Sequence, residues 1–158
     1  MQSDWKSLLK KSLNKAGLPG EALTAPPEGS SAQINMRGLL VNLEYDAGNN
    51  RLHLYCSLGV LPRDPGPALC ERLLEANLLG AETGGGHIGL YGATRALLYS
   101  LGLEADRLDG ARLANALNLF TEKAVALIAE VERASCGQAE TPQDSPLASP
   151  LLGNMLWG

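Results

Sequence analysis

Two histidines and three cysteines are the residues of this chain best suited to metal binding or catalysis. His53 and His87 have no Cys, His or carboxylate partner nearby at the spacing of metal ligands, so we predict no zinc site. Cys56, Cys70 and Cys136 are odd in number and widely separated, which argues against a disulfide framework. Cys56 falls in a strand pattern and Cys70 on the apolar side of a helix, as expected of small core residues in a reducing cytosol.

The run Gly84-Gly85-Gly86 is the candidate phosphate loop of the chain. Phosphate loops follow a strand and open a helix, whereas this run precedes a strand and lacks the Gly-Lys-Ser/Thr ending. A flexible turn is therefore the better interpretation.

Acidic side chains give no catalytic pattern either. Glu71, Glu75 and Glu82 are spread over a helix and a loop, where solvation explains them. The sequence contains no nucleophile elbow, pair of catalytic carboxylates or redox CxxC motif. We therefore expect no enzymatic activity, cofactor or metal, and a protein that works by binding. A small enzyme or ligand-binding α+β domain stays open as an alternative, because active sites also assemble from distant residues.

Composition narrows the partners. The 158 residues carry a net charge of -4 and are 45% hydrophobic and 19% charged, as in soluble single-domain proteins. Since Lys10-Lys11 is the largest basic cluster, nucleic acid is a poor candidate partner. The charged N-terminus has no apolar run long enough for a signal peptide, and no segment approaches the ~18 apolar residues of a membrane span. We expect a cytoplasmic protein without membrane insertion.

The elements that would position a binding surface begin with an amphipathic helix. Ser3 can cap a helix that runs to about Ala16 and stops at Gly17. One stripe of this helix is apolar: Trp5, Leu8, Leu9, Leu13 and Ala16. Residues 18–31, rich in proline, glycine and serine, are predicted to form an irregular connector.

Period-two alternation then predicts an antiparallel hairpin. Its first strand places Leu39, Val41, Leu43 and Tyr45 on one face, and residues 34–36 either extend this strand or form a preceding one. Residues 46–50 make the hairpin loop. The second strand alternates from residue 52 to residue 60, with every second side chain apolar: Leu52, Leu54, Cys56, Leu58 and Val60.

A helix from about residue 69 carries more apolar surface than one core requires. Its apolar positions cover roughly 200° of the circumference, about twice the arc that a surface helix needs: Leu69, Cys70, Leu73, Leu74, Ala76 and Leu78. The excess predicts contact with a second copy of the chain across a two-fold axis. Asn77 falls inside this arc, and a buried amide must be hydrogen-bonded. We expect Asn77 to fasten a neighbouring loop, to specify a pairing, or to be a satisfied structural residue near the helix end.

A second hairpin and a long helix complete the fold. Residues 87–91 and 95–101 form the hairpin, and Asp109 is predicted to cap a helix that runs to about Ala134. The order helix, two or three strands, helix, two strands, helix predicts an α+β fold with an antiparallel twisted sheet flanked by helices. Residues 1–135 make this domain, and residues 136–158 are a Pro- and Ser-rich tail with an apolar end.

Three segments carry family-like motifs. One is the helix ending Leu73-Leu74-Glu75-Ala76-Asn77-Leu78-Leu79 with the turn Thr83-Gly84-Gly85-Gly86, similar to an LLxxNLL ending and a glycine turn into a strand. The others are a strand that ends at Leu58-Gly59 and the last helix segment LANALNLFTEKAVA, residues 113–126. In this order and spacing, from about Trp5 to Arg133, the chain resembles the class I effector chaperones of bacterial type III secretion, the Tir chaperone family.

This resemblance implies a cytoplasmic bacterial homodimer, with no cofactor and no catalytic residue. Such a protein holds the N-terminal region of a secreted effector in extended form, soluble and export-competent, and needs apolar grooves and a strand edge for this. The implied effector-binding residues lie on the first helix and the adjoining sheet: Trp5, Leu8, Leu9, Leu13, Ile34, Met36, Leu39, Val41 and Leu43. The implied dimer contacts are Leu74, Asn77, Leu78, Ile88, Leu97 and Tyr99.

Alternatives stay open within this resemblance. A non-catalytic regulatory or structural interaction protein of the secretion apparatus is the alternative function on the same fold, and each groove residue can instead be an ordinary core residue. The connector at residues 18–31 is longer than a tight helix-to-strand turn. The tail after Cys136 lies outside the resemblance, and its apolar end could occupy the protein's own groove or contact the secretion machinery.

Overall fold

The computed structural model describes residues 2–15, 17, 23–28 and 30–137 of the chain. Its helices are α1 (Gln2–Lys15), α2 (Pro67–Asn77) and α3 (Gly110–Gly137), with short 3-10 turns η2 (Leu78–Gly80) and η3 (Ala105–Arg107). Its strands are β1 (Leu23–Glu28), β2 (Ser31–Met36), β3 (Leu39–Asp46), β4 (Arg51–Val60), β5 (His87–Tyr91) and β6 (Ala96–Glu104). Most of the predicted tail, residues 138–158, lies outside the described residues.

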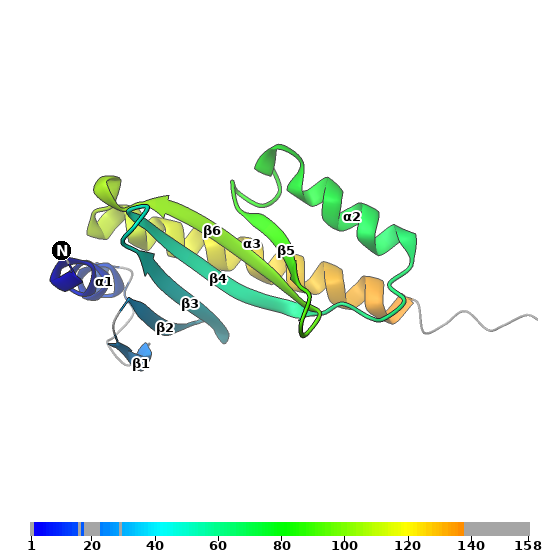
Figure 1. Cartoon of the computed structure of the whole chain (residues 1–158), viewed down its shortest axis with the longest axis horizontal. Coiled ribbons are helices and arrows are strands. Elements are labelled where there is room, and N and C mark those ends of the chain that lie inside the picture. The colour runs from blue at the N-terminus through cyan, green and yellow to red at the C-terminus, as the bar shows by residue number, and fades with distance from the viewer. Residues whose placement is uncertain (1, 16, 18–22, 29, 138–158) are drawn as a thin grey trace, which may run out of the picture.

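The strands form one antiparallel sheet in the order β1-β2-β3-β4-β6-β5. Helix α3 runs along one face of this sheet, α1 packs against α3, and α2 lies beside β5 (Figure 1). The predicted α+β fold, an antiparallel sheet flanked by helices, is confirmed. In the described part of the chain, no helix is both long and apolar enough to cross a membrane.

The connector predicted at residues 18–31 is the main error in the expected order of elements. Part of it is a strand, β1, which pairs with β2 at the edge of the sheet. Pro26 and Pro27 argued against a strand because proline lacks the N–H that a sheet requires, but an edge strand needs hydrogen bonds on one side only. Residues 34–36 belong to a separate strand, since Arg37 and Gly38, with φ of 54° and 86°, turn the chain from β2 into β3.

The core lies between the sheet and α3. Alternate residues of β3 and β4 are buried as predicted, from Val41 to Tyr45 and from Leu52 to Leu58. Val60 departs from this pattern and is 63% exposed. A register shift between Ser57 and Gly59 is the reason, because one extra residue in a strand reverses the facing of every residue after it.

Helix α3 supplies the other half of the core. Asp109 caps it as predicted, because its Oδ1 accepts hydrogen bonds from the backbone N–H groups of Ala111 and Arg112, both at 2.8 Å. The buried residues recur at helical spacing along one side, as expected from the sequence: Leu113, Leu117, Phe120, Ala124, Leu127 and Val131.

Candidate interaction surfaces

Asn77, at the last position of α2, joins this helix to the edge strand β5. Its Nδ2 donates a hydrogen bond to the carbonyl oxygen of Ile88 at 3.0 Å, and the N–H of Ile88 donates to its Oδ1 at 2.7 Å. The expectation that this amide is hydrogen-bonded is confirmed, with a strand rather than a loop as its partner. Both main-chain polar groups of Ile88 are thereby satisfied by one side chain.

The glycine run is a packed turn. Thr83 Oγ1 donates to the Gly86 carbonyl at 2.7 Å, and the Gly86 N–H donates to the Thr83 carbonyl at 3.0 Å. A Cβ at Gly86 would lie 2.5 Å from Cε2 of Tyr99 and 2.7 Å from the Ser100 carbonyl oxygen. Glycine is therefore required here because the strand β6 and its tyrosine ring pass against the turn.

Tyr99 connects this turn to the core. Its hydroxyl donates to the Thr83 carbonyl at 2.7 Å, and its ring stacks on Phe120 of α3 with centroids 4.5 Å apart. Burial raises the pKa of Tyr99 to about 12 and that of the Cys56 thiol to about 12 as well. Both groups are neutral near pH 7, so Cys56 is an unreactive core residue rather than a nucleophile.

The outer side of α2 exposes three leucines, Leu74, Leu78 and Leu79, here called the α2 ridge. Their exposed fractions are 71%, 69% and 94%, although the opposite side of the helix buries Leu69 and Ala76 in the core. The ridge thus contains the excess apolar surface that the sequence predicted.

An ion-pair network holds the ridge helix in place. Arg72 of α2 pairs with Glu82 and, at 3.1 Å, with Glu130 of α3. These two carboxylates raise the pKa of Arg72, and Arg72 in turn lowers the pKa of Glu82. The network therefore fixes the orientation of α2 relative to α3 while its leucines face outward.

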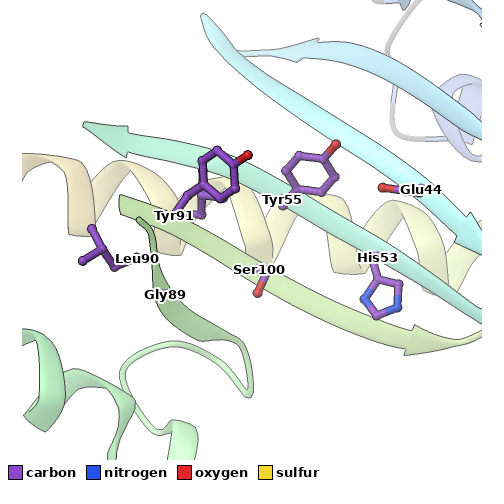
Figure 2. A pocket seen from close by; sticks show the side chains of 8 residues that line it. Glu44, His53, Tyr55, Gly89, Leu90, Tyr91 and Ser100 are labelled. Carbon is purple, nitrogen blue, oxygen red and sulfur yellow. The ribbon is translucent and has the colours of Figure 1, made fainter. Parts of the chain in front are cut away.

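The face of the sheet opposite α3 carries a shallow pocket of about 430 Å³ (Figure 2). Tyr55 of β4, Tyr91 of β5 and Leu98 of β6 supply apolar surface. Glu44, His53 and Ser100 add polar groups. A Cβ at Gly89 would meet nothing within 4 Å, so this part of the pocket is open. The pocket suits apolar side chains of a partner with polar groups beside them.

Metal chemistry finds no support among the residues that the structure describes. They contain no group of three or more His, Cys, Asp or Glu side chains that could hold a metal ion. His53 lines the pocket, opposite Glu44 on the neighbouring strand. His87 begins β5 and is exposed.

The predicted effector-binding residues lie mostly inside the protomer. The side chains of Trp5 and Leu8 are outside the described part of the chain. Leu39 is half-buried and packs against the core. The other six are each at most 1% exposed: Leu9, Leu13, Ile34, Met36, Val41 and Leu43. The structure brings these six together as a core, which the sequence had offered as the alternative interpretation.

The predicted dimer residues divide into two groups. Leu74 and Leu78 are exposed on the α2 ridge, beside half-buried Asn77 and Ile88. Leu97 and Tyr99 are buried at 3% and 1% exposure and pack in the core of the protomer. The first group forms one continuous surface with β5, and the second supports that surface from inside.

The pocket residues were missed by the sequence analysis. Tyr55 and His53 were assigned to the polar face of their strand, and Tyr91 and Leu98 to a hairpin without a function. Their alternation does place them on the face opposite the buried residues. The signal that could have found them is two tyrosines and a leucine on a face that otherwise carries polar side chains.

Comparisons with known proteins agree with this architecture. A search of curated protein sequences finds no match. Solved structures with the same fold include the HopA1-SchA chaperone-effector complex, at 17% identity and a TM-score of 0.61 over 78% of this chain and 92% of that one. They also include the ExsC-ExsE complex, at 18% identity and a TM-score of 0.55 over 92% of this chain and 98% of that one.

A third solved structure is the heterodimeric ExoU-SpcU complex of the type III secretion system of Pseudomonas aeruginosa. It matches at 14% identity and a TM-score of 0.60 over 80% of this chain and 96% of that one. In sequence, residues 7–127 match the family described as Tir chaperone protein (CesT). This match spans most of the chain, which therefore belongs to the Tir chaperone protein (CesT) family.

Proposed function

We propose that this protein is a cytoplasmic chaperone for a type III secretion effector, whose N-terminal region it keeps soluble and export-competent. The observation that carries the proposal is the chaperone-family match over residues 7–127. The fold is also that of chains from three complexes described as chaperone-effector or type III secretion assemblies or as the ExsC-ExsE pair. A binding role of this kind requires exposed apolar surface and no catalytic group.

The proposed effector surface is the open face of the sheet around the pocket. The groove residues expected from the sequence are core residues where their side chains are described, so they are not available to a partner. The pocket instead offers Tyr91, 56% exposed, beside half-buried Tyr55 and Leu98. Aromatic residues in a hollow of this kind are frequent anchors in protein interfaces.

Capture from the native host tests the function. The tagged full-length chain should retain a secreted protein, and deletion of that partner's N-terminal segment should abolish retention. A regulatory protein that binds a folded domain would keep its partner after the same deletion. Retention of no secreted protein would contradict the proposal.

A pair of surface substitutions tests the proposed site. Tyr91→Glu places a charge in the pocket, whereas Val125→Glu places one on α3 at similar exposure, 50% against 56%. We expect the first variant to lose the captured partner and the second to keep it. Equal capture by both variants would remove the pocket from the effector surface.

We also propose that the α2 ridge pairs with a second copy of the chain. Fully burying a leucine is worth about 1.5–3 kcal/mol, and three leucines stand outward here. Leu74→Glu/Leu78→Glu should convert a dimer to a monomer in light scattering after size-exclusion chromatography. The matched double variant Leu119→Glu/Val125→Glu, at two exposed positions of α3, should stay dimeric. A wild-type monomer at micromolar concentration would refute this pairing.

A further inference from the structure

Strand β2 presents hydrogen-bonding groups on its outer edge. The Tyr45 N–H donates to the Ser30 carbonyl at 2.7 Å, and β2 and β3 stay in one register from Ser31 opposite Glu44 to Met36 opposite Leu39. Bonded pairs alternate along an antiparallel ladder. The main-chain groups of Ala32 and Ile34 therefore bond to β3, whereas those of Gln33 point away from β3, toward β1.

Strand β1 fills that edge poorly. Its register against β2 shifts twice within six residues, between Leu23 and Ala25 and again between Ala25 and Glu28. Between the pairs Ala25 with Gln33 and Glu28 with Ser31, Pro26 and Pro27 contribute no N–H donor. A regular strand would form a continuous ladder at this edge, and β1 does not.

The opposite edge of the sheet is blocked where it meets α2. Asn77 already bonds both the N–H and the carbonyl of Ile88 on β5. A peptide that adds a strand needs consecutive free main-chain groups on one edge. Of the two edges, the one covered by the irregular strand β1 is the easier to open.

We propose that β1 is a displaceable occupant of a strand-addition site on β2, and that the site takes an extended peptide segment without proline opposite Ala32 and Gln33. This inference rests on the proposed function, since the effector supplies such a segment. Such a peptide would restore the donors that Pro26 and Pro27 lack. Strand β1 would cover the edge until the peptide arrives, which limits edge-to-edge association of free chains.

A synthetic peptide probe tests the site without knowledge of the effector. The probe is ALTATTEGS, residues 22–30 with both prolines replaced by threonine, labelled for fluorescence anisotropy. It is titrated into three full-length proteins: wild type, Pro26→Thr/Pro27→Thr, and a variant in which β1 is replaced by the same number of Gly and Ser residues. Pro65→Thr, in the loop before α2, is the matched proline control.

The affinities should follow the strength of the competing strand. We expect the Gly/Ser variant to bind the probe about tenfold more tightly than wild type, the equivalent of one good hydrogen bond. The Pro26→Thr/Pro27→Thr variant should bind several-fold more weakly than wild type, and Pro65→Thr should bind as wild type does. Equal affinities for all four proteins, or no binding to a folded Gly/Ser variant, would overturn the proposal.

Amide exchange in the wild-type chain gives a second readout if the Gly/Ser variant does not fold. The Gln33 amide should exchange at least tenfold faster than those of Ala32 and Ile34, and excess probe should slow it to their rate. Equal exchange at the three amides, or no effect of the probe on Gln33, would overturn the proposal. If no effector is captured from the host while the probe results hold, only the proposed function fails.

Discussion

Replacement of Asn77 by alanine tests how α2 is fastened to the sheet. The substitution removes two hydrogen bonds to Ile88, at 3.0 and 2.7 Å, each worth about 0.5–1.5 kcal/mol net. Alanine is the better helix former by up to about 0.7 kcal/mol, which offsets part of the loss. We therefore expect the free energy of unfolding to fall by about 1–2 kcal/mol.

Urea denaturation at one fixed protein concentration measures this change, because dimerisation would otherwise make stability depend on concentration. Asn115→Ala is the matched control, since Asn115 is exposed on α3 and gains the same helix propensity without losing a clamp. The control should be neutral or slightly more stable than wild type. If the two variants differ by less than about 0.5 kcal/mol, the Asn77 clamp does not contribute to stability as argued.

Two further predictions concern the core beside this clamp. Gly86→Ala should destabilise the protein by about 1–3 kcal/mol, because the added Cβ would overlap the Tyr99 ring and the Ser100 carbonyl; Gly89→Ala, where the Cβ is free, should lose far less, and equal thermal midpoints would contradict the packing. Burial raises the pKa of Cys56 from 9.0 to about 12, so the unfolded thiol loses its proton first as pH rises. The stability that Cys56 contributes is therefore present below pH 9 and is lost toward pH 12. Wild type should lose more unfolding free energy than Cys56→Ala between pH 9 and 11, and parallel curves would refute this.

The fold could be predicted where local patterns and burial agree. The alternation of β3 and β4, the cap at Asp109 and the glycine turn all follow from side-chain chemistry near in sequence. Strand β1 could not be predicted because prolines oppose strand formation locally, and only its place at the sheet edge permits it. Val60 was misplaced because a bulge is a tertiary adjustment that leaves no clear trace in the alternation.

The candidate site was harder to predict than the fold. An apolar residue in a core and one in a groove obey the same periodicity, so Leu9 and Val41 could not be distinguished from binding residues by sequence pattern. Leu74 and Leu78 were identified as surplus because α2 has more apolar arc than one core can cover. The pocket around Tyr55 and Tyr91 depends on three strands that meet only in the folded sheet.

The central claim is that this protein binds an effector segment in extended form. Hydrogen exchange by mass spectrometry on the complex purified from the host measures this directly, with the protein alone and its partner alone as references. We predict that the partner's N-terminal segment gains protection only where it contacts the chaperone, around Tyr91 and along β2, while the same segment exchanges freely in isolation. A partner whose protection lies in an independently folded domain, with its N-terminal segment unchanged on binding, would contradict the claim.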